Sequence, residues 1–221
     1  MFWRNDLRGL FREPLLIGVV LAPLGWIALV RFGTPAVADM LGERYGIDLA
    51  PYHPVILTGF LLLTSPIVIG AVTALIMLDE RDSGTLAALR VSPVSLGSYT
   101  AYRAAVAVAV TAIYTVATLS ASGLLPPRLV PHMVPIGLVN GACALVIALT
   151  ILALATNKVE GIAVVRALGI LVAGLPLVPY FMDTPWQLLF GSIPTYWPAK
   201  AFWVAGDGGT WWPYLVAGLG Y

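Results

Sequence analysis

Long apolar runs constrain the fold of this chain more than any other feature of its sequence. A helix needs about 20 predominantly apolar residues to cross the hydrocarbon core of a bilayer, whereas a helix on the surface of a soluble protein keeps one polar face. We therefore predict an all-α membrane protein, a polytopic helical bundle. Its expected spans cover residues 15–30, 54–78, 100–124, 132–156 and 162–181.

A further apolar run begins at Pro213 and reaches Tyr221, the last residue of the sequence. This run is shorter than half of a membrane span. Either the chain is truncated within a sixth span, the interpretation that we favour, or its last segment is only interfacial. We expect about six spans in one transmembrane domain over residues 1–221. Residues 183–212 are rich in Trp, Tyr and Pro, and they predict short re-entrant or interfacial helices at the outer surface, since Trp and Tyr prefer that depth.

Composition and charge exclude several classes of protein. Charged residues make up 10% of the chain, against about 25% in a typical soluble domain. The net charge of +1 provides no basic face for nucleic acid. Cys143 is the single cysteine and lies in an apolar run, so it predicts a buried side chain. His53 and His132 have no second ligand at metal-binding spacing, and we expect no metal site.

Prolines and polar residues indicate where the first two spans bend and end. Pro23 predicts a kink in the first span. The second span is longer than the ~30 Å hydrocarbon core requires, so it tilts or bends, and Pro66 is the expected position. Between these spans, residues 31–53 predict a polar loop in which a helical turn around Val37–Tyr45 is an option.

The basic residues predict the orientation of the bundle. Residues 1–14 carry apolar and arginine faces, as expected of a helix that lies in the headgroup plane. Basic residues gather in cytoplasmic loops, and a cytoplasmic amino terminus places eight of the 12 inside and four outside. We therefore expect an integral protein of a prokaryotic plasma membrane with its amino terminus in the cytoplasm.

The polar segment 79–99 lies between the second and third spans and reads DERDSGTLAALRVSPVSLGSY. Asp82 or Ser83 can cap a helix start, and Thr85–Arg90 suits a helix of roughly two turns. Pro93 disfavours helical geometry at the residue before it and ends that helix. We predict a short amphipathic helix clamped between two spans, through which a partner outside the membrane can act on both. The alternative is a set of ordinary interface charges.

This segment resembles the cytoplasmic coupling segment of type-2 ABC transporter permeases. The resemblance rests on an acidic residue, a Gly-Thr-Leu triplet, a leucine and a Ser-Pro turn, here Glu80, Gly84, Thr85, Leu86, Leu89, Ser92 and Pro93. It implies that two permease subunits, identical or different, assemble with two cytoplasmic ABC ATPase subunits. Leu86 and Leu89 would then seat in a groove of the ATPase, and Glu80 would pair with a basic residue there or on the amino-terminal helix.

The chain carries no motif for catalysis. It has no Gly-x-x-x-x-Gly-Lys-Ser/Thr phosphate loop and no nucleophile paired with a histidine at similar depth. We therefore expect no enzyme and no cofactor in this chain, with ATP and Mg²⁺ bound by the partner subunit.

Polar residues inside the spans are few. They are candidates for a substrate path. The alternative is that they form hydrogen bonds with the backbone or with neighbouring helices. The residues are Thr111, Tyr114, Thr115, Thr118 and Asn140. Gly137 and Gly141 permit close helix contacts, within the bundle or between subunits. A path this apolar suits a hydrophobic or amphipathic substrate, drug-like or lipid-like. The predicted function is the transmembrane subunit of an ATP-driven exporter; the alternative is a non-transporting membrane scaffold or assembly factor.

Overall fold

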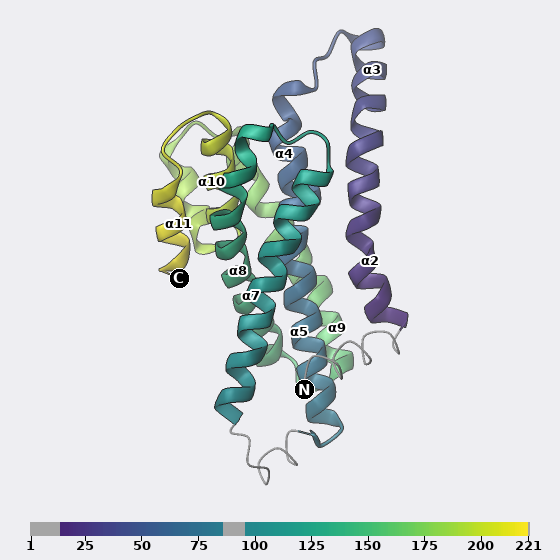
Figure 1. Cartoon of the computed structure of the whole chain (residues 1–221), viewed down its shortest axis with the longest axis vertical. Coiled ribbons are helices and arrows are strands. Elements are labelled where there is room, and N and C mark those ends of the chain that lie inside the picture. The colour runs from purple at the N-terminus through teal and green to yellow at the C-terminus, as the bar shows by residue number, and fades with distance from the viewer. Residues whose placement is uncertain (1–13, 86–95, 221) are drawn as a thin grey trace.

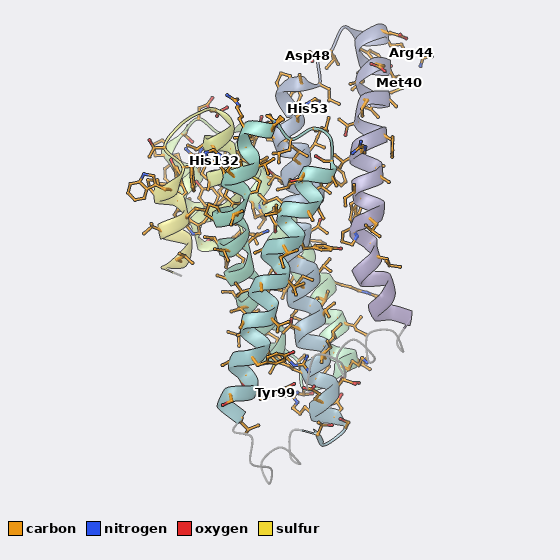
Figure 2. All side chains as sticks on the ribbon, viewed as in Figure 1. Met40, Arg44, Asp48, His53, Tyr99 and His132 are labelled. Carbon is orange, nitrogen blue, oxygen red and sulfur yellow. The ribbon has the colours of Figure 1, made fainter. Side chains whose placement is uncertain are left out.

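The computed structural model describes residues 14–85 and 96–220, which are helical apart from short connections. Within these ranges, five helical segments are long and apolar enough to cross a membrane, and the predicted all-α polytopic membrane protein is confirmed. Figure 2 labels side chains at both ends of the bundle, and we call these the Tyr99 end and the Asp48 end. The five segments are Leu21–Tyr45, Ala50–Asp82, Leu96–Ala121, Pro127–Leu154 and Lys158–Phe181.

The first span continues well beyond its expected end. The predicted polar loop is wrong for residues 31–45, which are helical, and the turn around Val37–Tyr45 is confirmed. Hydropathy detects where a helix leaves lipid but not where it ends, because charged side chains are compatible with a helix in water. Gly46 ends the helix in the left-handed conformation at φ +66°. The elements of this helix are α2 (Pro14–Ala28), the π-helical turn η1 (Leu29–Gly33) and α3 (Thr34–Tyr45).

The second span is the most buried of the five. It comprises η2 (Ala50–Tyr52), α4 (His53–Leu57), the π-helical turn η3 (Thr58–Leu62) and α5 (Thr64–Asp82). The expected break near Pro66 lies one turn earlier, where the Leu63 N–H donates to the Thr58 carbonyl at 3.0 Å. Since Pro66 has no N–H, the Leu62 carbonyl lacks the donor that a regular helix would provide, and the helix is irregular at that position.

The next three spans pack around α5 (Figure 1). Helices approach most closely at glycines: a Cβ added to Gly70 of α5 would lie 2.7 Å from the Ala144 carbonyl oxygen. Gly137 and Gly141, which the sequence offered for either role, make such contacts within this chain, since an added Cβ would lie 3.0 Å from the Ala112 carbonyl oxygen and 2.8 Å from the Val108 carbonyl oxygen, respectively. The elements are α7 (Leu96–Ala121), η4 (Pro127–His132), α8 (Met133–Leu154), α9 (Lys158–Gly169), η5 (Ile170–Gly174) and η6 (Leu175–Phe181).

The last elements are η7 (Pro185–Ser192), α10 (Tyr196–Gly206) and α11 (Trp212–Leu219). Helices α10 and α11 lie beside the upper half of α8, on the opposite side of the bundle from α2 and α3 (Figure 1). The side chains of Tyr196, Phe202 and Trp203 are buried, and Trp203 Nε1 donates to the Thr58 hydroxyl at 2.8 Å. Residues 183–212 therefore contain a helix packed inside the bundle; an interfacial depth for this segment and a sixth span from Pro213 stay predictions.

Candidate functional site

Four consecutive charged residues, Asp79, Glu80, Arg81 and Asp82, end α5 at the Tyr99 end. Successive residues of an α-helix are rotated by about 100°, so these four side chains point to nearly all sides of α5. Glu80 contacts α7, Arg81 contacts the connection after α8, and both aspartates contact Lys158 at the start of α9. The end of α5 is therefore the point at which the second span is joined to the third, fourth and fifth.

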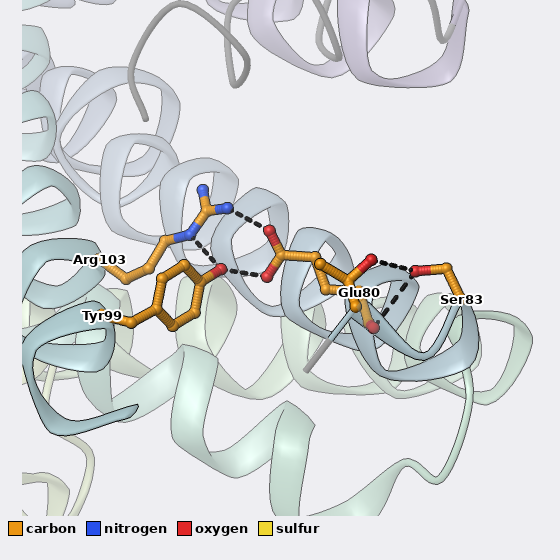
Figure 3. Close-up of polar contacts among 5 residues, drawn as sticks. Glu80, Ser83, Tyr99 and Arg103 are labelled. Carbon is orange, nitrogen blue, oxygen red and sulfur yellow. Dashed lines mark hydrogen bonds and ion pairs between the residues drawn. The ribbon is translucent and has the colours of Figure 1, made fainter. Parts of the chain in front are cut away.

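Glu80 contacts two side chains from α7 (Figure 3). Arg103 donates through Nη2 to Glu80 Oε1 at 2.5 Å and through Nε to the Tyr99 hydroxyl at 2.8 Å. The Tyr99 hydroxyl donates in turn to Glu80 Oε2. Tyr99 and Arg103 are four residues apart and so share one face of α7. Both oxygens of the Glu80 carboxylate thus have donors in its own chain. The pairing of Glu80 with a basic residue of the ATPase or of the amino-terminal helix, which the resemblance implies, stays a prediction.

Burial makes this ion pair hard to separate. Only 9% of the Arg103 side chain and 20% of the Glu80 side chain are exposed. Moving one partner away would leave the other charge shielded from water without a counter-charge, which is strongly unfavourable. The Arg103 guanidinium also lies 5.2 Å from the centre of the Tyr99 ring, close enough for a cation–π contact. We infer that α5 and α7 move together at this end.

Lys158, the first residue of α9, joins the fifth span to α5. Its ammonium group donates to Asp79 Oδ1 at 3.1 Å, and its backbone N–H donates to Asp82 Oδ2 at 3.1 Å. A carboxylate at the start of a helix satisfies a free backbone donor and favours the positive end of the helix dipole. Asp82 therefore caps the start of α9. Its predicted role as a cap of the helix at Thr85–Arg90 stays a prediction.

Arg81 joins the fourth span to α5. Its Nη2 donates to the carbonyl of Ala155 at 3.0 Å and to the carbonyl of Thr156, both just beyond the end of α8. The last carbonyls of a helix have no intrahelical donor, so a cation placed there satisfies them and interacts favourably with the helix dipole. Four spans thus meet through the charges of residues 79–82.

The chain turns sharply after α5. Gly84 has φ +74°, a left-handed conformation that other residues adopt only with strain. The Ser83 hydroxyl donates to the Glu80 carbonyl at 3.2 Å and lies 2.9 Å from the Thr85 hydroxyl. Gly84 and Thr85 of the predicted coupling segment therefore lie in the turn that ends α5. The other predicted coupling residues, Leu86, Leu89, Ser92 and Pro93, lie outside the described residues.

Sequence reasoning missed the role of Tyr99 and Arg103. In the charge count, Arg103 is one of the eight basic residues expected on the cytoplasmic side, and the sequence gives it no other role. The signal was present: an arginine one turn inside an apolar span is rare and usually has a partner, and Tyr99 four residues earlier lies on the same helix face. The third member, Glu80, comes from another helix, and spacing along one helix does not reveal it.

The candidate path residues lie where α7, α8 and the second span meet, and most are buried. The hydroxyl of Thr111 donates to the Ala107 carbonyl at 2.7 Å, and that of Thr118 donates to the Thr115 carbonyl at 3.3 Å. Tyr114 is half-buried. These contacts match the alternative that the sequence left open, hydrogen bonds within and between helices. A role in a substrate path stays a prediction.

Asn140 connects three spans. Its amide donates to the Leu62 carbonyl at 2.7 Å and to the Thr115 hydroxyl at 3.0 Å. The Leu62 carbonyl is the one that Pro66 leaves without a backbone donor. Asn140, which lies in the fourth span, thus provides the hydrogen-bond donor that the break in the second span leaves missing.

Replacing Asn140 with leucine should lower the free energy of unfolding by about 1 kcal/mol, the usual size of a hydrogen bond between membrane helices. Unfolding of the purified protein in a detergent–denaturant titration measures this change. Thr150→Val is the control, since among the described residues the Thr150 hydroxyl bonds only to the Val146 carbonyl of its own helix. Equal stability of the two variants would show that Asn140 does not support the break.

Comparison with known proteins adds a family to this geometry. A family model described as fluoroquinolones export permease protein Rv2686c-like matches residues 6–221. Two relatives from Mycobacterium tuberculosis are 56% identical over 220 residues, with 100% of this chain and 87% of each relative covered. They are the fluoroquinolones export permease protein MT2760 of strain CDC 1551 / Oshkosh and the fluoroquinolones export permease protein Rv2686c of strain ATCC 25618 / H37Rv. No solved structure matches the chain.

Proposed function

Since this chain belongs to the Rv2686c-like family of fluoroquinolones export permease proteins, we propose that it is the membrane-embedded subunit of an ATP-driven drug exporter. The relatives are named for fluoroquinolones, and we propose substrates of that class, amphipathic ring compounds, for this chain too. A separate ABC ATPase subunit binds ATP and Mg²⁺, and a second permease subunit completes the transporter. The amino terminus and the Tyr99 end face the cytoplasm of a prokaryotic cell.

The junction at the end of α5 carries this proposal. The segment that begins at Ser83 connects α5 to α7, and the Glu80–Arg103 ion pair joins the same two helices a second time. Lys158 and Arg81 extend the junction to the fifth and fourth spans. A force applied by the ATPase to the connecting segment would therefore move these spans as one unit. Such a junction is expected of a subunit that receives mechanical work and does no chemistry of its own.

The decisive test uses the two leucines that would contact the ATPase. Leu86→Asp with Leu89→Asp places two carboxylates where the proposed contact with the ATPase needs apolar side chains. We expect about tenfold less ATPase subunit to co-purify with the full-length protein, since hot-spot contacts carry most of the binding energy of an interface. ATP-driven uptake of a fluoroquinolone into inverted vesicles should fall with it.

Leu86→Met with Leu89→Met is the matched control and should keep both the partner and transport, because volume and apolar character are retained. If no ATPase co-purifies with the unmodified protein even after mild cross-linking, the exporter proposal is wrong and a non-transporting scaffold takes its place.

A further inference from the structure

We propose that the groove between the first span and the start of the second binds an amphipathic amine, an apolar ring system that carries a protonated nitrogen. This inference rests on the proposed export of drugs. It adds the chemistry that the chain would recognise and a position for the ligand near the Asp48 end. The groove lies where α3 extends past α4 and leaves a space between the two helices (Figure 1).

The inner part of the groove is an apolar pocket of about 290 Å³. Val30, Gly33 and Val37 line it from the first helix, and Ile56 and Phe60 line it from the second span. The walls are almost entirely aliphatic or aromatic. Such a surface favours a flat or compact apolar body and contributes mainly through the removal of apolar area from water.

Thr34 provides a polar group inside this pocket. Its side chain is only 8% exposed, yet its hydroxyl has no hydrogen-bond partner among the described residues. Other threonines of the bundle, such as Thr58 and Thr73, donate to the carbonyl four residues earlier. Thr34 lines the pocket, so its hydroxyl can donate a hydrogen bond to a polar atom of a bound ligand.

Carboxylates line the outer part of the groove. A second pocket of about 430 Å³ is lined by Asp39 and Asp48 and shares Leu49 with the apolar pocket, so the two pockets are adjacent. Asp48 lines this pocket and accepts one hydrogen bond through Oδ1, from the Ala50 N–H at 2.9 Å. Neither pocket is lined by a described lysine or arginine.

This arrangement selects a ligand with an apolar body and a positive nitrogen. The apolar body would occupy the inner pocket, and the ammonium group would lie between the two aspartates at the mouth. An anionic lipid headgroup would meet carboxylates there and be repelled. A neutral acyl chain would leave both the carboxylates and the Thr34 hydroxyl unused. Charge complementarity therefore favours the amine.

Gly33 allows the pocket to be filled without disturbing the helix. Its backbone is helical at φ −76°, and an added Cβ would meet only the Leu29 side chain, at 3.5 Å. Leucine at this position suits a helix better than glycine and would project into the groove. Gly25 on the same helix is exposed outside the groove, with nothing within 4 Å of an added Cβ, and Gly25→Leu is the matched control.

The experiment measures equilibrium binding of norfloxacin to the full-length chain in nanodiscs of zwitterionic lipid, with neither ATP nor an ATPase present. Norfloxacin carries a secondary amine and is itself fluorescent. Gly33→Leu should weaken binding at least about tenfold, because overpacking leaves no room for the ring, and Gly25→Leu should bind as the unmodified protein does. Asp39→Asn with Asp48→Asn should weaken binding about fivefold, but should not weaken binding of the N-acetylated drug, which lacks the positive charge.

Binding to Gly33→Leu at the unmodified level, or no binding to the unmodified chain, overturns the proposed site. An equal loss for the amine and the N-acetylated drug in the aspartate variant shows that charge is not recognised, and it overturns the amine as ligand. Since no ATPase takes part, these results leave the coupling experiment untouched. Intact norfloxacin binding by an unmodified protein with which no ATPase co-purifies would instead contradict the exporter and not the groove.

Discussion

Replacing Arg103 with alanine is expected to lower the free energy of unfolding by about 3 kcal/mol, the cost of removing one partner from a buried ion pair. The change removes the guanidinium that lies 2.5 Å from Glu80. It also removes the Nε donor to the Tyr99 hydroxyl. A carboxylate would remain at a position where its side chain is only 20% exposed. Titration of the purified protein with SDS, followed by tryptophan fluorescence, measures the loss.

Two further variants separate the ion pair from general effects of the substitution. Arg166→Ala removes an exposed arginine of α9 and should change stability by less than about 0.5 kcal/mol. Glu80→Gln with Arg103→Gln should recover most of the stability, because no unpaired charge stays buried. If Arg103→Ala is as stable as Arg166→Ala, charge does not join α5 to α7.

The neutral double variant also tests what the pair does in transport. It should fold, since amides can still exchange hydrogen bonds, but it no longer carries the electrostatic attraction between the second and third spans. Under the proposed mechanism, it should keep the ATPase partner and hydrolyse ATP while exporting less drug per ATP. Unchanged export per ATP would show that the loop connection alone transmits the movement.

The spans were predictable because the bilayer imposes a simple requirement on sequence. A run of about 20 apolar residues has few other structures available, since the backbone must satisfy its own hydrogen bonds in lipid. The break in the second span was predictable for a similarly local reason, because Pro66 removes a single donor. The same reasoning failed for residues 31–45. Their charges predict exposure to water, but water does not end a helix.

The junction at the end of α5 was only half predictable. The segment 79–99 stood out by its polarity, but the partners of its charges come from helices far along the chain. Arg103 is 23 residues from Glu80, and Lys158 is 79 residues from Asp79. Nothing in the local pattern reports which helices will be neighbours. The groove beside α3 could not be predicted for the same reason. It forms between two helices, and the sequence does not show that these helices diverge.

Replacing Gly141 with alanine is expected to lower the free energy of unfolding by about 2 to 3 kcal/mol, a large effect for a single methyl group. Gly141 of α8 packs directly on the backbone of α7. An added Cβ would lie 2.8 Å from both the Cα and the carbonyl oxygen of Val108. Side chains can rotate away from such a contact, whereas a helix backbone can only move as a whole.

Gly169→Ala is the matched control, since an added Cβ on this α9 glycine meets nothing within 4 Å. This variant should be as stable as the unmodified protein or slightly more so, because alanine favours a helix. The difference between the two alanine variants isolates the helix contact from the intrinsic preference of the residue. Equal stabilities would mean that α7 and α8 separate readily. That outcome would also count against the proposed role of the junction at the Tyr99 end. Spans that are joined at one end transmit movement only if their helices stay packed along the rest of their length.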